Sequence, residues 1–179
     1  MDIYKLNFTI LELEVFSYLS IRVGEELSQR ELAQILKVSP TAIANTVKLL
    51  GEKGLIKVKK TKTINFVTFN RENYKAIELK RVENLKMIYI SGLSDFLEEK
   101  FPGTTIILFG SYARGEDIHS SDIDIAIIGG KDKFLNLEPL ENLLKRKINI
   151  NFYSSWKDIH KHLKNNILNG IILTGSVEL

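Results

Sequence analysis

Three stretches in the first third of the chain place apolar residues at every third or fourth position. The first runs from Thr9 to about Val23, and the Thr-x-x-Glu spacing at its start is that of a helix-capping box. The second opens at Ser28 with the same kind of spacing. The third runs from Pro40 to about Gly51, and Ser39 is placed to cap it. The pattern therefore predicts three short helices.

The third predicted helix has a clear apolar face. Ile43, Val47 and Leu50 recur at i, i+4 and i+7, which puts them on one side of the helix. The remaining positions are expected to point outward: Thr41, Ala42, Asn45, Thr46 and Lys48. These side chains are then available to contact another molecule.

Two β-prone runs follow, at residues 55–58 and 64–69, with the lysine-rich residues 59–63 between them. They predict a hairpin. Three helices followed by a hairpin is the order of a winged helix-turn-helix. Residues 28–69 resemble the winged-helix domains of many prokaryotic regulators, and this resemblance implies double-stranded DNA as a partner.

The charge distribution agrees with a polyanion partner for this part of the chain. Residues 1–71 hold 11 Lys+Arg against 7 Asp+Glu, whereas residues 72–179 hold 14 against 15. Without an arginine on the third helix, direct reading of bases would be modest. The alternative interpretation of the hairpin lysines is that they form a hairpin tip exposed to solvent. The candidate DNA contacts are Thr41, Asn45, Thr46, Lys48, Lys59, Lys60 and Lys62.

Residues 73–100 are compatible with a long helix that connects two domains, and Gly92 is a point at which it can be interrupted. Because this segment is long, one interpretation is that it forms a contact in a homodimer. The apolar spacing is too irregular for a coiled coil.

The period of the pattern changes after Gly103. Residues 105–109 form a continuous apolar run, as in a strand buried on both faces. Strands and helices then alternate, which predicts a small α/β domain. The segments are a strand at 123–128, a helix at 137–144, a strand at 148–152, and a helix at 155–168 capped by Ser155.

The composition is that of a chain able to bury a core, with 44% hydrophobic and 26% charged residues among 179. The absence of cysteine excludes disulfides, thiolate zinc sites and a cysteine nucleophile. No signal peptide or apolar run of about 18 residues occurs, so we expect a cytoplasmic protein.

The most informative stretch reads FGSYARGEDIHSSDIDIAII, from Phe109 to Ile128. A strand that ends in Gly110-Ser111 and opens into a short helix offers backbone N–H groups and a hydroxyl to a phosphate. Asp122 and Asp124 lie at i and i+2 on the next strand, so both carboxylates project from one face. Paired carboxylates beside a phosphate cradle suit Mg²⁺ bound with a nucleoside triphosphate.

At these residues the chain resembles the DNA polymerase beta-like nucleotidyltransferase superfamily and its minimal nucleotidyltransferase branch. The resemblance implies that Asp122 and Asp124 hold Mg²⁺ or Mn²⁺, that Gly110 and Ser111 hold the triphosphate, and that Arg114 assists with phosphate charge. Such enzymes transfer a nucleoside monophosphate to an acceptor hydroxyl and release pyrophosphate.

The chain departs from the family pattern at one position. The family has a third carboxylate on a later strand, where this chain has Asn149, or less favourably Asn151. An amide carbonyl can ligate a hard cation, so Asn149 stays a candidate metal ligand, but it is no useful base. Glu116 or Asp117 could replace the missing acid only if their loop folded back.

With the resemblance, the expected fold class is α/β (α+β): a winged helix-turn-helix at 1–72, a connecting helix at 73–100, and a nucleotidyltransferase-like domain with a mixed sheet at 101–179. Three functions stay open. They are an active nucleotidyltransferase, a DNA-binding regulator that senses a nucleotide without turnover, and an antitoxin-type domain that neutralises a helical toxin partner.

Overall fold

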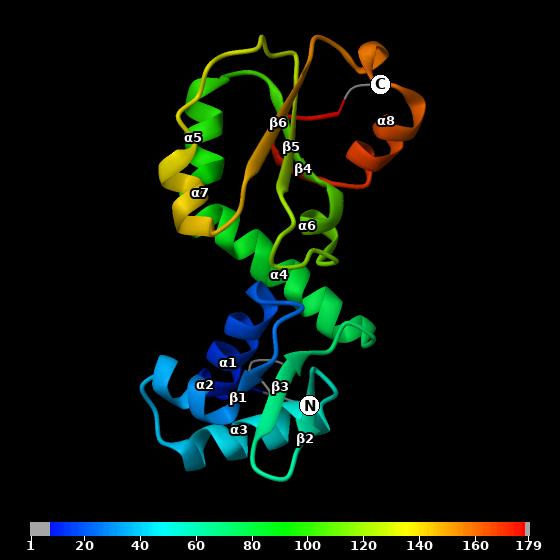
Figure 1. Cartoon of the computed structure of the whole chain (residues 1–179). Helices are drawn as coiled ribbons and strands as arrows, with labels where there is room; N and C mark the ends of the chain where they lie inside the picture. Colours follow the sequence, from blue (N-terminus) through cyan, green and yellow to red (C-terminus); the bar gives the residue numbers. More distant parts are fainter. Residues whose placement is uncertain (1–7, 178–179) are drawn as a thin grey trace, which may run out of the picture. The chain divides into compact units, whose positions relative to one another are not determined.

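The computed structural model describes residues 8–177 (Figure 1). The chain forms two compact units, one up to Lys80 and the other from Arg81 onward. The predicted domain ranges also include residues 1–7 and 178–179, which lie outside the described residues. In the part of the chain that is described, no helix is both long and apolar enough to cross a membrane.

The three predicted helices of the first unit are present: α1 (Ile10–Ile21), α2 (Gln29–Ile35) and α3 (Pro40–Glu52). Both predicted capping boxes form. Thr9 Oγ1 accepts a hydrogen bond from Glu12 N at 3.2 Å, and Ser28 Oγ accepts one from Glu31 N at 3.1 Å. Ser39 caps α3, because its Oγ accepts from Ala42 N at 3.2 Å.

The first unit has a three-stranded antiparallel sheet in the order β1-β3-β2. The strands are β1 (Leu27–Ser28), β2 (Ile56–Lys60) and β3 (Asn65–Phe69). The pairing of β2 with β3 confirms the hairpin. The two-residue β1 is not among the predicted strands, because so short a strand has no periodicity to detect. The order of elements is that of a winged helix-turn-helix.

One residue of α3 does not lie where the sequence pattern puts it. The pattern places Thr46 outward, but this residue is only 5% exposed. Thr46 lies three residues after Ile43 and next to Val47, so it shares their buried face. The outward placement of Thr46 is therefore wrong, whereas Thr41 and Asn45 are exposed as expected.

The predicted connecting helix is two helices, α4 (Tyr74–Ile90) and α5 (Leu93–Lys100). Gly92 separates them in a left-handed conformation with φ of 77°. The boundary between the two units falls within α4. Leu93 and Leu97 are fully buried in the core of the second unit, so α5 is part of that unit and not of a connector.

The second unit contains a four-stranded mixed sheet in the order β6-β5-β4-β7. Its strands are β4 (Thr105–Phe109), β5 (Ile123–Ile128), β6 (Ile148–Tyr153) and β7 (Ile171–Thr174). The pair β5–β6 is parallel, and the other two pairs are antiparallel. The mixed sheet confirms the expected fold class, although β7 is not among the predicted strands.

The helices of this unit that follow α5 are α6 (Gly110–Arg114), α7 (Glu138–Leu144) and α8 (Lys161–Leu168). The segment predicted as one helix at 155–168 is a 3₁₀ turn (Trp156–Asp158) followed by α8. Ser155 still acts as a cap, because its Oγ accepts from Lys157 N at 3.2 Å.

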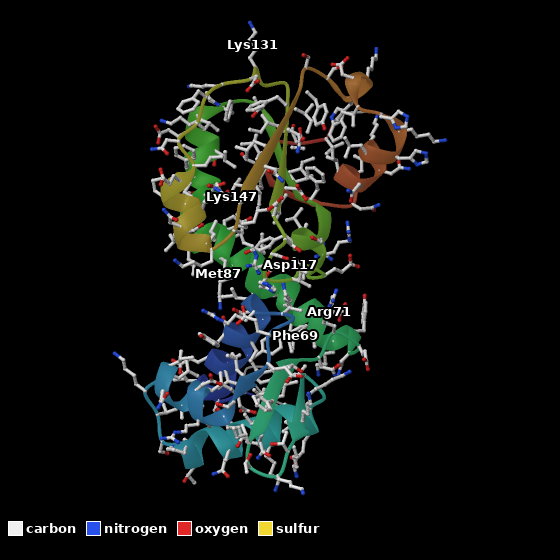
Figure 2. All side chains as sticks on the ribbon, viewed as in Figure 1. Phe69, Arg71, Met87, Asp117, Lys131 and Lys147 are labelled. Carbon is white, nitrogen blue, oxygen red and sulfur yellow. The ribbon has the colours of Figure 1, made fainter. Side chains whose placement is uncertain are left out.

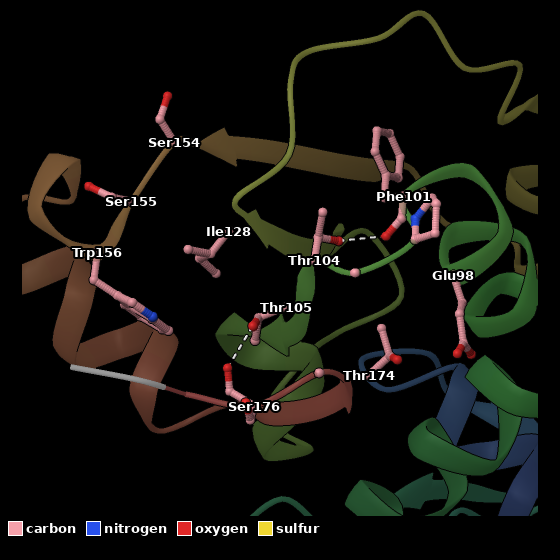
Figure 3. A pocket seen from close by; sticks show the side chains of 13 residues that line it. Glu98, Phe101, Thr104, Thr105, Ile128, Ser154, Ser155, Trp156, Thr174 and Ser176 are labelled. Atoms are coloured by element: carbon pink, nitrogen blue, oxygen red, sulfur yellow. Dashed lines mark hydrogen bonds between the residues drawn. The ribbon is translucent and has the colours of Figure 1, made fainter.

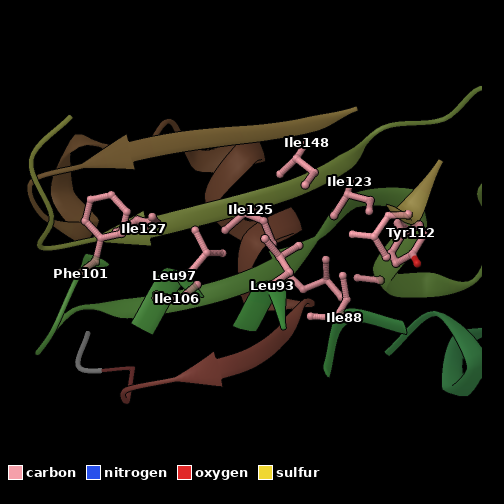
Figure 4. Packing of buried hydrophobic residues seen from close by; sticks show 13 residues of the cluster. Ile88, Leu93, Leu97, Phe101, Ile106, Tyr112, Ile123, Ile125, Ile127 and Ile148 are labelled. Atoms are coloured by element: carbon pink, nitrogen blue, oxygen red, sulfur yellow. The ribbon is translucent and has the colours of Figure 1, made fainter. Parts of the chain in front are cut away.

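Apolar side chains cover both faces of the sheet. Ile123, Ile125 and Ile127 of β5 pack on one face with residues of α5, as Figure 4 shows. Ala126 and Ile128 pack on the other face with Trp156 and residues of α8. The alternation along β5 therefore leaves Asp124 on the face of Ala126 and Ile128, at the end of the strand where apolar cover stops.

Candidate functional site

The two aspartates of the motif lie together with Asn149. Asp124 and Asn149 are direct partners in the parallel register of β5 and β6. Asn149 Nδ2 donates to Asp122 Oδ2 at 3.0 Å and lies 3.5 Å from Asp124 Oδ1. Both carboxylates therefore reach the same amide, as expected for side chains two residues apart on an extended segment.

The predicted phosphate cradle, Gly110 and Ser111, adjoins this acid pair. Phe109, the last residue of β4, is the antiparallel partner of Asp124, so Gly110 follows directly beside that carboxylate. A Cβ built on Gly110 would lie 2.4 Å from Asp124 Oδ2. Gly110 also has a φ of 76°, which L side chains rarely adopt. Only glycine meets both requirements at the start of α6.

The electrostatics of the acid pair depend on its partial burial. Burial raises the pKa of Asp124, the hydrogen bond from Asn149 opposes this effect, and the charge of Asp122 raises the pKa further. Two carboxylates held this close stabilise a cation between them. The hydrogen bonds from Asn149 compensate only part of the negative charge on the two aspartates, because an amide carries no net charge.

The alternative third position, Asn151, is not at the site. Its Nδ2 donates to the backbone carbonyl of Ile125 at 3.4 Å. Asn149 is thus the residue that faces the aspartates from β6.

Arg114 and Glu116 are engaged with one another. Arg114 Nε donates to Glu116 Oε2 at 2.7 Å, and Arg114 Nη1 donates to Asn166 Oδ1 of α8 at 2.9 Å. The guanidinium is exposed, so a phosphate could still reach it. Glu116 is directed to this arginine and does not replace the missing acid.

Asp117 belongs to a buried polar network that the sequence does not reveal. The side chain of Asp117 is labelled in Figure 2. Its Oδ1 accepts from Asn84 Nδ2 at 2.7 Å, and its Oδ2 lies 3.5 Å from Arg146 Nη2. Asn84 Nδ2 also donates to the carbonyl of Tyr112 at 2.8 Å, and Arg146 Nη1 donates to the carbonyl of His119.

This network holds the loop between the cradle and the acid pair. Tyr112 lies in α6, Asp117 and His119 lie in the loop that leads to Asp122, and Arg146 precedes β6. Asp117 and Arg146 are 1% and 7% exposed. Polar residues such as these give no periodic signal, because their partners are distant in sequence.

The donor set fits a divalent cation with oxygen ligands. Asp122, Asp124 and the carbonyl oxygen of Asn149 are hard ligands of the type that Mg²⁺ and Mn²⁺ prefer. Across residues 8–177 there is no group of three or more His, Cys, Asp or Glu side chains placed to share a metal ion. The site therefore offers two carboxylates and one amide.

A separate hollow of about 540 Å³ lies near the opposite end of β5 (Figure 3). Trp156 and several hydroxyl side chains line it, and Thr105 Oγ1 donates across it to the carbonyl of Ser176 at 2.6 Å. Ile128, at the far end of β5 from the acids, belongs to its lining. The hollow and the acid pair are separate features.

In the first unit, glutamates neutralise part of the hairpin charge. Lys57 Nζ lies 2.5 Å from Glu72 Oε1, and Lys59 Nζ lies 3.1 Å from Glu26 Oε1. Lys59 and Lys60 belong to strand β2 and not to the hairpin turn.

The other candidate lysines differ from these two. Within the described residues, Lys60 and Lys62 form no ion pair. Both are exposed, as is Lys48, which lies 4.0 Å from Glu52 on α3.

Comparisons with known proteins assign the second unit. A family model described as "Nucleotidyltransferase domain" matches residues 90–177. The putative protein adenylyltransferase MJ1215 of Methanocaldococcus jannaschii is 42% identical over 59 residues, which are 30% of this chain and 69% of that protein. A structure of a point mutant of ZitR from Lactococcus lactis overlaps 56% of this chain and 66% of its own at 20% identity, with a TM-score of 0.39, too low to support an argument. On the family match and the identity to the adenylyltransferase relative, the chain belongs to the nucleotidyltransferase family.

Proposed function

We propose that the second unit binds a nucleoside triphosphate together with Mg²⁺ or Mn²⁺, with Asp122 and Asp124 as the principal metal ligands. The observation that carries the proposal is the contact of Asp124 with Gly110, which joins the acid pair to the start of α6. A metal bound by these acids would share the triphosphate oxygens with the cradle. The cation, when bound, supplies neutralisation of phosphate charge.

Each residue near the acid pair has a separate proposed role. Gly110 and Ser111 are the first two residues of α6, so no preceding helical turn accepts from their backbone N–H groups, which are proposed to donate to phosphate oxygens. Arg114 adds positive charge at the end of the same helix, held by Asn166 and Glu116. Asn149 is a third ligand through its carbonyl oxygen.

The first unit is proposed to bind double-stranded DNA through α3 and the hairpin. Its exposed polar side chains on α3 can reach the groove, and its lysines can contact phosphates. The candidate contacts are Thr41, Asn45, Lys48, Lys59, Lys60 and Lys62. Thr46 is no longer among them because it is buried.

These two proposals together describe a DNA-binding protein whose second unit senses a nucleotide. The replacement of the family's third carboxylate by Asn149 favours sensing over turnover, because Asn149 cannot accept the proton of an acceptor hydroxyl. The cytoplasmic location, the homodimer contact and a helical toxin partner stay predictions of the sequence.

Transfer of a nucleoside monophosphate is the second candidate function, and the relative named as a putative protein adenylyltransferase favours it. In that reaction an acceptor oxygen bonds to the α-phosphorus, the bond to the bridging oxygen breaks, and pyrophosphate leaves. The proton of the acceptor hydroxyl would have to pass to water, since neither Asn149 nor Glu116 serves as its base.

Calorimetric titration of the full chain with Mg²⁺ and α,β-methylene-ATP tests the binding proposal. We expect saturable binding that Asp124→Asn weakens by more than about tenfold, because a charged ligand is lost. Asp132→Asn, in the loop after β5, is the matched control and should bind as the wild type does. Equal affinity of the wild type and Asp124→Asn would refute the assignment.

A second experiment separates sensing from transfer. The full chain is incubated with Mg²⁺ and ATP labelled at the α-phosphate, and released pyrophosphate and labelled products are measured. Sensing predicts neither product, together with a DNA mobility shift that changes when nucleotide is added. Pyrophosphate release that Asp122→Asn abolishes would establish transfer instead.

A further inference from the structure

The amide of Asn149 occupies the side of the acid pair that faces β6. Its Nδ2 is within hydrogen-bond distance of Asp122 and at the limit for Asp124. Both contacts are to carboxylate oxygens, which only accept hydrogen bonds, so the amide must direct its NH₂ group and not its carbonyl toward them. The partial positive charge of that group lies where a cation would otherwise compensate the two acids.

The carboxylates that the protein supplies to this site balance one divalent cation and not two. Asp122 and Asp124 together contribute two negative charges. The nearby acids are engaged elsewhere, Glu116 with Arg114 and Asp117 with Asn84 and Arg146. A second divalent cation would have only the nucleotide phosphates as anionic ligands, because the two aspartates already neutralise the first.

We infer that this site holds one divalent cation, bound together with the nucleotide, because Asn149 supplies no charge where a second cation would need a third carboxylate. The inference rests on the proposed function and adds the metal stoichiometry to it. The amide serves the two acids in the free protein through its NH₂ group. It turns about its terminal torsion to offer Oδ1 when the cation arrives, which exchanges one polar contact for another.

The cation should bind weakly without nucleotide. Mg²⁺ and Mn²⁺ favour six oxygen ligands, and two carboxylates with one amide fill only part of that shell. Phosphate oxygens held at Gly110 and Ser111 would complete it. Metal and nucleotide therefore increase each other's affinity by the same factor, as linkage requires.

The experiment counts Mn²⁺ bound to the full chain by electron paramagnetic resonance of the free ion, with and without saturating α,β-methylene-ATP. We expect one Mn²⁺ per chain with the nucleotide, and affinity for Mn²⁺ alone that is lower by at least about tenfold. Asn149→Asp should bind two, because it adds the third negative charge. Asn149→Ala removes the amide without adding charge and should still bind one.

The outcomes separate the inference from the proposed function. Two Mn²⁺ per wild-type chain with nucleotide bound, or an unchanged count in Asn149→Asp, would overturn the inference and leave nucleotide binding standing. Absence of nucleotide binding to the wild type would overturn both. Circular dichroism and thermal unfolding of each variant establish that it is folded, and nucleotide binding by Asn149→Ala shows that the cradle is intact.

Discussion

The carboxylate of Asp124 lies against the backbone of Gly110, so closely that a Cβ on Gly110 would be 2.4 Å from Asp124 Oδ2. The two residues come from different segments of the chain and are 14 positions apart in sequence. Their contact brings the proposed metal ligand to the beginning of the proposed phosphate cradle. The glycine is required here for space as well as for its backbone conformation.

Substitution Gly110→Ala should displace Asp124 and weaken nucleotide binding by more than about tenfold, as expected for the loss of a charged contact. Gly103→Ala is the control, because Gly103 has a φ of 77° but nothing within 4 Å of the position that a Cβ would take. Both variants should lose about 1–2 kcal/mol of stability from backbone strain. Titration with Mg²⁺ and α,β-methylene-ATP measures the difference, and equal affinities would contradict the proposed role of the contact between Gly110 and Asp124.

The ion pair between Asp117 and Arg146 should matter for stability far more than surface pairs do. Asp117→Asn leaves the guanidinium of Arg146 buried without its carboxylate, which costs about 3 kcal/mol. Glu99→Gln removes the exposed pair with Lys100 and should cost less than about 0.5 kcal/mol. Urea denaturation compares the two.

The same substitution should also affect the acid pair, because Arg146 holds the loop that leads to Asp122. Asp117→Asn is expected to lower the affinity for metal and nucleotide even under conditions in which it is fully folded. If folded Asp117→Asn binds metal and nucleotide as tightly as the wild type does, the network has a structural role only.

Among the hairpin lysines, those without ion pairs should contribute most to DNA affinity. Lys62→Gln should weaken binding to duplex DNA and reduce the slope of log affinity against log salt by about 1. Lys57→Gln should have a smaller effect, because Glu72 already neutralises this lysine. Fluorescence anisotropy over a salt series checks both, and equal slopes in the two variants would contradict the ranking.

The pH dependence of stability in the first unit should include Glu12. Burial by itself raises the pKa of this side chain, but hydrogen bonds from Lys53 and Thr9 outweigh it and hold the pKa below the ordinary value of 4.5. A lowered pKa in the folded state gives stabilisation that is present above the ordinary pKa and lost as the pH falls through the lowered value.

Glu12→Gln removes the negative charge that pairs with Lys53 Nζ at 2.5 Å. Its stability should fall below that of the wild type near neutral pH, and the difference should shrink in acid. Thermal unfolding over a pH series measures it. A constant difference at every pH would show that packing and not charge accounts for the loss.

Local signals in the sequence predict much of this fold. Capping residues such as Ser28 and Ser39 mark helix starts through contacts within three positions, and the alternation around Asp124 is visible within one strand. Local signals do not predict features that depend on partners far away in the sequence. The short strand β7 and the pairing of Asp117 with Arg146 both depend on segments far apart in the chain.

The same distinction between local signals and distant partners applies to the candidate site. The spacing of Gly110-Ser111 and Asp122-x-Asp124 is enough to predict two neighbouring groups. Which asparagine of β6 faces them depends on the register of β5 and β6, which pairs Asp124 with Asn149 and not with Asn151. Register is set by the whole hydrophobic pattern of a sheet, so a single strand does not reveal it.

The most direct test of the central claim is anomalous diffraction from crystals of the full chain grown with Mn²⁺ and α,β-methylene-ATP. We predict a single manganese peak within about 2.0–2.3 Å of carboxylate oxygens of Asp122 and Asp124, with phosphate density along Gly110 and Ser111. Nucleotide bound elsewhere, with no manganese at these two aspartates, would contradict the account.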